Sequence, residues 1–222
     1  MTFAAETPSV DAPLLPRDVV LATGNQGKAR EFARLLGPAF SIRAMPAGVK
    51  PPPETGDTFA ENARDKATAV FAALGEVTAV LADDSGLEVA ALGGLPGVRS
   101  ARFAREGATD SENVAKLLRE LEGRTDRTAR FVCHLALVMP ETSWSVCGRI
   151  IFESSGVLEG TIEVAPRGGE GFGYDPVFRP LGSERTLSEM SPDEKNAISH
   201  RARAVKALVA VMQQEGAPSS GF

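Results

Sequence analysis

The stretch Leu81-Ala82-Asp83-Asp84-Ser85-Gly86-Leu87 places two adjacent carboxylates directly after a run of apolar residues that is typical of a strand. Aspartate is disfavoured inside strands, and a Ser-Gly pair often reverses the chain, so we expect the strand to end in an acidic turn. Two neighbouring like charges contribute little to the stability of a fold. A divalent cation, or a water molecule that must lose a proton, would make use of both. The stretch therefore predicts a catalytic turn at the end of a sheet strand.

Helices and strands are expected to alternate along the first half of the chain. Strands are predicted at 19–22 and 77–82, a helix at 28–36, and a second helix from Thr58, where a capping box is spaced over 58–61. Farther along we expect a helix from Thr109 or Asp110, strands at 131–139, 144–152 and 160–164, and a final helical region from Ser191. This order indicates an α/β fold: a mixed central sheet flanked by helices, in two lobes around an active-site cleft.

The composition is that of a globular protein whose 222 residues can bury a sizeable core. Residues 1–16 are expected to form a disordered N-terminal extension, 17–214 a single domain of two lobes, and 215–222 a flexible tail. No stretch approaches the ~20 apolar residues needed to span a bilayer, and the N-terminus is a poor secretory signal. The net charge of −5 argues against a protein that coats nucleic acid.

The two cysteines, Cys133 and Cys147, lie on apolar runs that we expect to form a hairpin. If Met139 faces Trp144, Cys147 lies opposite Ala136, and its offset from Cys133 is roughly 10 Å, beyond disulfide reach. Two free thiols are typical of a reducing compartment, so we expect a cytoplasmic protein. The two histidines do not stand in Cys/His ligand spacing, so a zinc site is not expected.

An anion site is predicted at the loop Thr23-Gly24-Asn25-Gln26-Gly27-Lys28, which joins a strand to the first turn of a helix. Unpaired backbone N–H groups and the helix dipole favour a negative charge there. Thr23 and Asn25 add side-chain donors, and Lys28 adds a mobile cation. The loop is not a Walker A motif, because Ala29 stands where a Ser or Thr should follow the Gly-Lys pair. The alternative is a structural turn with a solvated lysine.

A magnesium site is predicted at Asp84, with Glu54 as a second acid. Magnesium usually takes one or two carboxylates together with phosphate oxygens of the substrate, so two acids suffice. Asp84 would bind the ion and orient or deprotonate water. The alternatives are that Asp83 and Asp84 serve turn or capping chemistry, and that Glu54 is a solvated loop residue.

A base-binding segment is predicted at Gly171-Phe172-Gly173-Tyr174-Asp175. Its glycines let the backbone approach a flat ligand, Phe172 would stack on a base, and Asp175 would accept hydrogen bonds from ring N–H groups. The alternative is a packed β-bulge with a buried Phe172.

A basic cluster is predicted near the start of the last helical region, at Lys195, Ser199, His200 and Arg201. Arginine suits bidentate phosphate contacts, and lysine suits a point-charge contact. Lys195 and Ser199 share one helix face, whereas His200 and Arg201 point elsewhere unless the helix axis breaks. The alternative is a solvated basic face.

Taken together, these segments resemble the inosine triphosphate pyrophosphatase family (dITP/XTP pyrophosphatases). The resemblance covers about 19–212 and rests on five motifs in the family's order: Leu21–Lys28 with Glu31, Ala82–Val89, Gly93–Val98 with Ser100-Ala101-Arg102, Gly171–Phe178, and Ser191–Arg201. The sequence departs from the family pattern at Pro53-Glu54, where many relatives carry two acids, and at Arg99 and Arg105.

The resemblance implies a two-lobed mixed α/β fold with a central active site, and a homodimer. It implies Mg²⁺-dependent hydrolysis of ITP, dITP and XTP to the monophosphate and pyrophosphate, which keeps deaminated purines out of DNA and RNA. Carried onto this sequence, it makes Asp84 the general base beside Ser85 and places the phosphates on Thr23, Asn25 and Lys28. It assigns recognition of base and phosphates to Phe172, Gly173, Tyr174, Asp175, Lys195, His200 and Arg201.

Two other interpretations stay open. A Maf-like pyrophosphatase for other nucleotides shares the general architecture, but it is not expected to carry Phe172–Asp175 and Ser199–Arg201. A nucleotide-binding protein without turnover would not need both Asp84 and Lys28. Pyrophosphate release from ITP, dITP, XTP, dTTP, GTP and ATP would separate the three.

Overall fold

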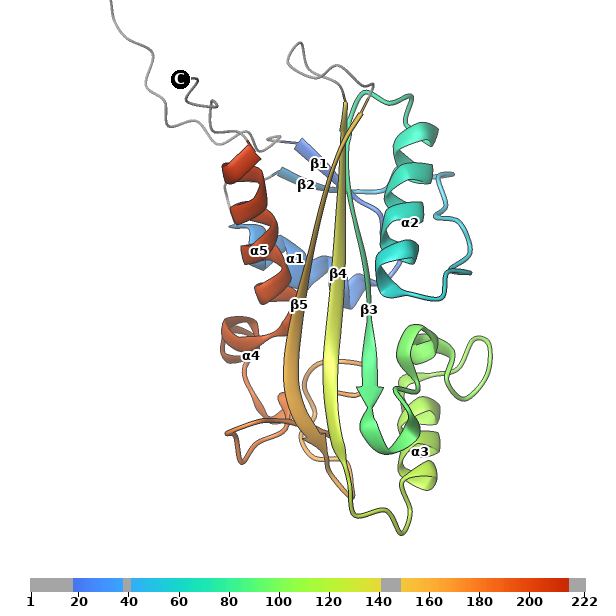
Figure 1. Cartoon of the computed structure of the whole chain (residues 1–222), viewed down its shortest axis with the longest axis vertical. Coiled ribbons are helices and arrows are strands. Elements are labelled where there is room, and N and C mark those ends of the chain that lie inside the picture. Colours follow the sequence, from blue (N-terminus) through green and yellow to red (C-terminus); the bar gives the residue numbers. More distant parts are fainter. Residues whose placement is uncertain (1–17, 38–40, 141–148, 216–222) are drawn as a thin grey trace, which may run out of the picture.

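The computed structural model describes residues 18–37, 41–140 and 149–215. Its helices and strands in chain order are β1 (Asp18–Leu21), α1 (Gln26–Leu36), β2 (Ser41–Ala44), α2 (Phe59–Ala73), β3 (Ala79–Val89), α3 (Asp110–Glu120), β4 (Thr128–Pro140), β5 (Arg149–Ile162), β6 (Phe178–Pro180), α4 (Pro192–Ile198) and α5 (His200–Glu215). Three short 3₁₀ turns add to them: η2 (Ala90–Leu92), η3 (Gly97–Arg102) and η4 (Leu187–Glu189). Six strands form one sheet in the order β2-β1-β3-β4-β5-β6. Figure 1 shows the long strands β3, β4 and β5 running along the molecule with helices on both sides.

The sheet is mixed, which confirms the predicted α/β class. β1 pairs in parallel with β2 and β3, whereas the pairs β3–β4, β4–β5 and β5–β6 are antiparallel. The strand predicted at 77–82 was expected to end in an acidic turn, and this is wrong. Strand β3 continues through Asp83 and Asp84 and stays paired with β4 beyond them. Pairing along a long partner strand outweighs the low strand propensity of aspartate.

An opening in the sheet lies beside these two aspartates because β1 is much shorter than β3. The pairing of β1 with β3 ends at Leu21 and Leu81, and the chain then turns into the loop before α1. Within the described ranges, no strand pairs with 82–87 on this side of β3. The backbone around the aspartates is therefore not paired with a strand here, and the Asp83 C=O accepts a hydrogen bond from Lys66 Nζ at 2.9 Å instead.

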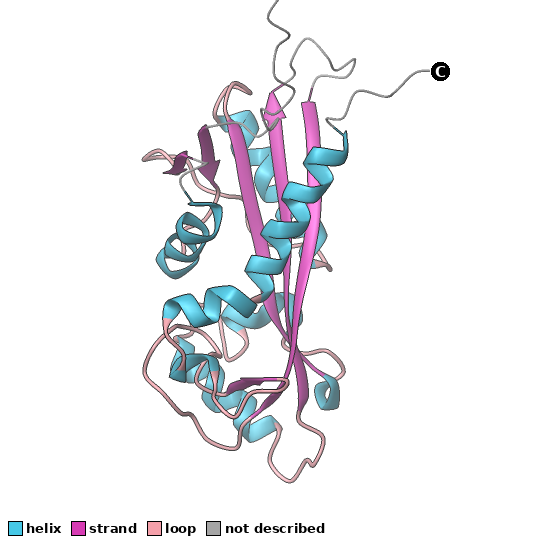
Figure 2. Cartoon of the chain, turned by 90° about the vertical axis from the view of Figure 1, so that its left-hand side faces the viewer, coloured by secondary structure: helices cyan, strands magenta, loops and turns pink. Residues whose placement is uncertain are grey.

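Strand alternation sends apolar side chains to both faces of one half of the sheet. On one face, α2 packs over a cluster formed by Val20, Ala22, Val80, Ala82, Ala136 and Val138. On the other face, α1 and α5 pack over Val19, Leu21, Leu81, Cys133, Leu135 and Leu137. Figure 2 shows α5 lying along the long strands. Each large side chain fully buried in this way contributes roughly 1.5–3 kcal/mol.

The other half of the long strands forms a second core with α3, β6 and the last part of the chain before α4. Its buried members include Leu87, Leu117, Phe131, Leu158, Phe178 and Leu187. Helix α3 was predicted to start at Thr109 or Asp110; it begins at Asp110, and Thr109 caps it with a capping box. The two cores, at opposite ends of β3, β4 and β5, give the predicted two lobes (Figure 1).

The predicted register of the β4–β5 pair is wrong. Met139 pairs with Ile150 and not with Trp144, because the pairing of β4 with β5 places Pro140 opposite Arg149. The strand predicted at 160–164 is the end of β5. Cys133 is buried and free, whereas Cys147 and Trp144 lie outside the described residues.

The expected extension at 1–16 lies outside the described residues, and so does the expected tail apart from Glu215, the last residue of α5. Among the helices in the described ranges, none combines the length and the apolar character needed to cross a bilayer.

Candidate active site

A cavity of about 260 Å³ lies at the opening beside β3. Its walls come from the loop before α1, from α2, β3, η3 and α3, and from the segments 172–175 and 200–201. Most of the predicted site residues line it: Thr23, Gly24, Asn25, Lys28, Glu54, Asp84, Ser85, Phe172, Gly173, Tyr174, Asp175, His200 and Arg201. Gln26, Gly27 and Lys195 are not part of the lining. The fold thus brings five distant segments of the sequence to one place: 23–28, 54, 84–85, 172–175 and 200–201.

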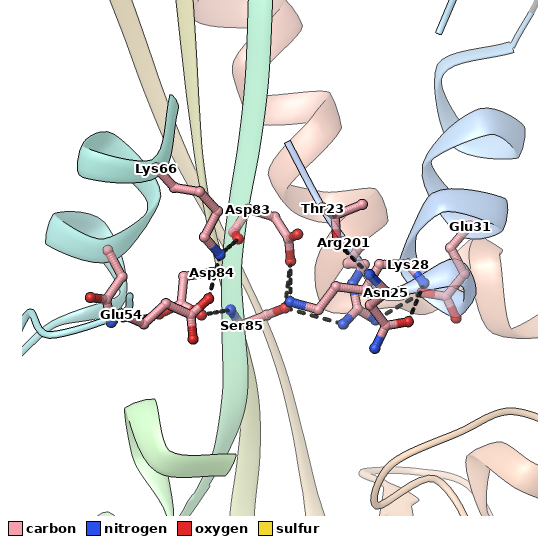
Figure 3. Close-up of polar contacts among 11 residues, drawn as sticks. Thr23, Asn25, Lys28, Glu31, Glu54, Lys66, Asp83, Asp84, Ser85 and Arg201 are labelled. Carbon is pink, nitrogen blue, oxygen red and sulfur yellow. Dashed lines mark hydrogen bonds and ion pairs between the residues drawn. The ribbon is translucent and has the colours of Figure 1, made fainter. Parts of the chain in front are cut away.

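The two adjacent aspartates point to opposite faces of β3, because side chains alternate along a strand. Asp83 faces α1, where its carboxylate lies 2.8 Å from Lys28 Nζ and accepts a hydrogen bond from Ser85 Oγ at 2.8 Å. Burial alone would raise the pKa of Asp83, but Lys28, Arg201 and Lys66 outweigh it and lower the pKa to about 2. Asp83 is therefore an ionised anchor for Lys28 (Figure 3).

Asp84 faces α2 and lines the cavity. Its carboxylate accepts hydrogen bonds from Asn62 Nδ2 at 2.9 Å and from the Ser85 N–H at 3.0 Å. Burial and the nearby carboxylate of Glu54 raise the pKa of Asp84 to about 6. A carboxyl group whose pKa approaches neutrality is suited to accept a proton from water. Of the two neighbours, Asp84 is the candidate base.

Two polar side chains of α2 that the sequence motifs do not include, Asn62 and Lys66, complete this part of the site. Lys66 Nζ lies 2.5 Å from Glu54 Oε1 and donates to the Asp83 C=O at 2.9 Å. Both lie on the buried face of α2, together with Ala63 and other apolar residues. Polar residues at buried helix positions are the sequence signal that identifies such groups.

The predicted anion site, the loop 23–28, lies at the N-terminus of α1. Asn25 caps the helix, because its Oδ1 accepts a hydrogen bond from the Lys28 N–H at 3.1 Å. Thr23 Oγ1 accepts one from the Asn25 N–H at 3.1 Å. Both side chains shape the loop through acceptor oxygens, and donation to an anion by the Thr23 O–H and the Asn25 Nδ2 stays a prediction. Lys28 and the first-turn N–H groups of Gln26 and Gly27 are the groups of this loop suited to a phosphate.

The base-binding segment predicted at Gly171–Asp175, a strip with two aromatic residues among glycines, packs against the loop 23–28 at the start of α1. A side chain at Gly27 would lie 2.8 Å from the Phe172 ring, so this contact needs glycine. Lys195 Nζ lies 4.7 Å, and Arg201 Cζ 5.3 Å, from the centroid of the same ring, distances at which cations are attracted to an aromatic face. Asp175 accepts a hydrogen bond from the Phe172 N–H at 2.9 Å and pairs with Lys195 at 2.6 Å. Phe172 also lines the cavity, where it can stack on a ligand.

Tyr174 and Gly173 attach this strip to the lobe that contains α3. The Tyr174 hydroxyl donates to the Ser100 C=O at 2.8 Å, and the Gly173 N–H donates to Asp110 Oδ2 at 2.7 Å. Burial raises the pKa of Tyr174 far above its usual range, so the hydroxyl keeps its proton. The contribution of Tyr174 is a neutral hydrogen bond that fixes the strip.

His200 is buried, yet neither ring nitrogen has a hydrogen-bond partner among the described residues. Its ring stacks on Phe131, with centroids 4.8 Å apart and planes at 10°. Burial and the positive charges of Arg201 and Lys195 lower the pKa of His200 well below its usual range, so the imidazole is neutral. Buried polar atoms without partners are costly, and a neutral imidazole can donate at one nitrogen and accept at the other. His200 is therefore a candidate ligand contact.

The last helical region breaks at Ser199. Its extended backbone (φ −63°, ψ 155°) separates α4 from α5. The break allows Lys195 on α4 and Arg201 on α5 to approach the same ring of Phe172, and it brings His200 to the cavity. His200 and Arg201 were predicted to share a face with Lys195 only if the helix axis breaks, and it breaks here.

A sequence model of the Ham1 family matches residues 19–211. The chain belongs to the Ham1 family. It is 46% identical to the dITP/XTP pyrophosphatase of Bacillus licheniformis over 203 residues, which are 89% of this chain and 99% of that protein. It is 42% identical to the Bacillus subtilis dITP/XTP pyrophosphatase over 205 residues, which are 90% and 99% of the two chains.

Solved structures of the Ham1 family have the same fold. The Staphylococcus aureus Ham1 protein superposes with a TM-score of 0.75 at 38% identity, over 89% of this chain and 99% of that one. A HAM1 protein from Coxiella burnetii superposes with a TM-score of 0.74 at 42% identity, over 89% and 98%. The resemblance drawn from the five motifs is thereby confirmed.

In this Ham1 chain the two predicted metal ligands fit a magnesium ion. Asp84 and Glu54 both line the cavity, and their mutual repulsion helps to raise the pKa of Asp84. A divalent cation relieves such repulsion, and carboxylate oxygens are the donors that Mg²⁺ prefers. Within the described ranges, no group of three or more His, Cys, Asp or Glu side chains is arranged to hold a metal. Two carboxylates nevertheless suffice for an ion that takes its other ligands from phosphate and water.

Proposed function

We propose that this member of the Ham1 family hydrolyses ITP, dITP and XTP to the nucleoside monophosphate and pyrophosphate. The observation that carries the proposal is one cavity lined by Asp84, by Lys28 at a helix N-terminus, by Phe172, and by His200, whose ring nitrogens have no partner among the described residues. The shared name of the relatives, dITP/XTP pyrophosphatase, supports the same chemistry. The reaction would remove deaminated purines from the nucleotide pool before they enter DNA or RNA.

Catalysis on the α-phosphorus would divide between the two aspartate faces of β3. Asp84 would accept a proton from the attacking water, a role worth about 10²–10⁴ in rate. Lys28 is held by Asp83, so a phosphate at the N-terminus of α1 would share this cation with that carboxylate. Lys28 and the first-turn N–H groups would stabilise the charge that develops as pyrophosphate leaves.

Mg²⁺ held by Asp84 and Glu54 would supply charge neutralisation at the phosphate oxygens and a more acidic water. An aspartate that also binds a cation is a weaker base, so Asp84 would then mainly orient the water. Lys66, which pairs with Glu54 in this structure, would hold that carboxylate at the site.

Selectivity would depend on the carbonyl group of a 6-oxo purine. Adenine carries an amino donor at the same position, so a site that offers donors to the carbonyl leaves buried groups unpaired when ATP enters. The neutral His200 and the guanidinium of Arg201, which both line the cavity, are the donors suited to this role. Phe172 would stack on the purine, and Asp175 orients its segment.

We also propose that the protein is a cytoplasmic homodimer, as the family resemblance implies. The free, buried thiol of Cys133 supports a reducing compartment. Gel filtration with light scattering would test the dimer directly.

The test of the proposed function is release of pyrophosphate from ITP, dITP, XTP, GTP, ATP and dTTP, with Mg²⁺ and after its removal by a chelator. We expect Mg²⁺-dependent release from ITP, dITP and XTP and much slower release from the other three. Preferred hydrolysis of dTTP would indicate a Maf-like activity instead. Nucleotide binding without release would indicate a binding protein.

A further inference from the structure

Glu31 lies on α1, one turn beyond Lys28, and contacts two cations of the purine-binding region. Its Oε1 lies 2.6 Å from Lys195 Nζ, and its Oε2 lies 2.8 Å from Arg201 Nη1. The Glu31 side chain is 13% exposed and each of its two partners is 6% exposed, so these are well-shielded ion pairs. One carboxylate thus uses a different oxygen for each cation.

The same two cations lie near the ring of Phe172, the candidate stacking side chain. Lys195 Nζ and Arg201 Cζ approach the ring to 4.7 Å and 5.3 Å from its centroid. The two cations come from different helices, α4 and α5, and the helix axis changes between them. Glu31 therefore joins two elements that would otherwise place their charges independently.

A closed ring of contacts passes through Glu31 and reaches the catalytic strand. Arg201 Nη2 donates to Ser85 Oγ at 3.1 Å, and Ser85 Oγ donates to Asp83 Oδ2 at 2.8 Å. Asp83 pairs with Lys28 at 2.8 Å, and Lys28 shares α1 with Glu31. Figure 3 shows this row of side chains running from β3 to α1. Arg201 and Lys28 are therefore linked through Ser85 and Asp83, so a displacement of one side chain changes the contacts of the other.

We propose that Glu31 is a positioning residue that couples purine recognition to the phosphate-binding helix, an inference that rests on the proposed function. It acts through Lys195 and Arg201. Without its charge, two shielded cations near the Phe172 ring repel each other, and among the described residues Asp175 and the Ser85 hydroxyl are the partners that still hold them. The Phe172 ring and the Arg201 guanidinium then lose their fixed spacing.

The test is Glu31→Gln, which keeps the shape of the side chain and removes its charge. We expect KM for ITP and the dissociation constant for IMP, measured by titration calorimetry, to rise about tenfold to a hundredfold. We expect kcat to change by less than about threefold, because Asp84 and Glu54 are not touched and Lys28 stays paired with Asp83. Glu31→Asp keeps the charge but is one methylene shorter, so its KM should lie between those of the wild type and Glu31→Gln.

The matched control is Glu153→Gln, which removes a carboxylate paired with Arg64 at 2.8 Å outside the cavity. It should leave KM, kcat and IMP affinity unchanged. The inference is overturned if Glu31→Gln binds IMP and ITP as the wild type does, or if it lowers kcat with KM unchanged. A wild type that releases no pyrophosphate from ITP would refute the proposed function instead, and the calorimetric affinities for IMP would still decide the role of Glu31.

Discussion

Asp83 and Asp84 have the same side chain and adjacent positions, yet their pKa values are about 2 and about 6. Asp83 meets Lys28 on the α1 face of β3, whereas Asp84 meets Glu54 on the α2 face. The sequence showed that the pair was unusual but not that the two acids separate. Their separation depends on β3 continuing as a strand, which the pairing with β4 imposes.

Replacing Asp84 by Asn should reduce kcat for ITP at least about a hundredfold, because the group that accepts the proton is lost. Binding of IMP should persist, because Phe172 and His200 are unchanged. The matched control is Asp65→Asn, an exposed acid of α2 that does not line the cavity. Near-normal turnover in Asp84→Asn would remove Asp84 from the catalytic role.

The same substitution should not destabilise the metal-free protein at pH 8, despite the altered hydrogen bonds. Folding raises the pKa of Asp84 from 3.8 to about 6, so the native state holds more protons than the unfolded state between these pH values. The free energy of unfolding therefore falls as pH rises through this window, by about 1–3 kcal/mol, and Asn removes that fall. Urea titrations of both proteins at pH 4 and pH 8 measure it. If ionisation of Asp84 does not lower stability, the unfolding free energies of the wild type and Asp84→Asn will differ by the same amount at pH 4 and at pH 8. That result would contradict the prediction.

His200 should remain neutral well below pH 6.5, because burial and neighbouring cations lower its pKa. The chain has only one other histidine, His134, which is partly exposed, so an NMR titration contains two imidazole signals that a His134→Gln variant assigns. We expect His134 to gain its proton first as the pH falls. In the unfolded chain, His200 gains a proton below its ordinary pKa of 6.5, whereas the buried His200 stays neutral. The free energy of unfolding should therefore fall as the pH drops through 6.5 and below. Titration of His200 near or above pH 6.5 would contradict the neutral donor and acceptor proposed for the purine.

At the scale of elements, local signals were read correctly and long-range pairing was not. The capping boxes at Thr58, Thr109 and Ser191 each involve side chains within one helical turn, so the sequence alone locates the helix starts. The register of β4 with β5 is set by the whole length of two strands and by the connection between them. Apolar alternation over a few residues does not determine that register.

Gly86 should be essential for the contact between β3 and η3. A Cβ at this position would overlap Ser100 Oγ and lie 2.6 Å from the Gly97 C=O. Gly86→Ala should therefore cost about 1–3 kcal/mol of stability, measured by thermal or urea unfolding, because η3 must move away. Gly169→Ala is the matched control, since nothing lies within 4 Å of a Cβ there. Equal stability of the two variants would show that η3 does not depend on this close approach.

At the scale of the whole molecule, the motifs predicted the residues of the site better than its construction. Thirteen of the predicted site residues share one cavity, because the opening beside β3 lies where their five segments meet. Asn62 and Lys66 were missed because their chemistry depends on partners on β3 and in the loop at Glu54, which only the fold provides. The sequence places Glu31 in a motif, but its two partners are far away in the chain.

The central claim is that one nucleotide occupies this cavity and that water attacks its α-phosphorus at Asp84. Hydrolysis of ITP in water enriched in oxygen-18, followed by mass spectrometry of both products, tests it most directly. The label should appear in the phosphate of IMP, with pyrophosphate unlabelled. Label in pyrophosphate, or release of orthophosphate with IDP, would place the attack on another phosphorus and contradict the account.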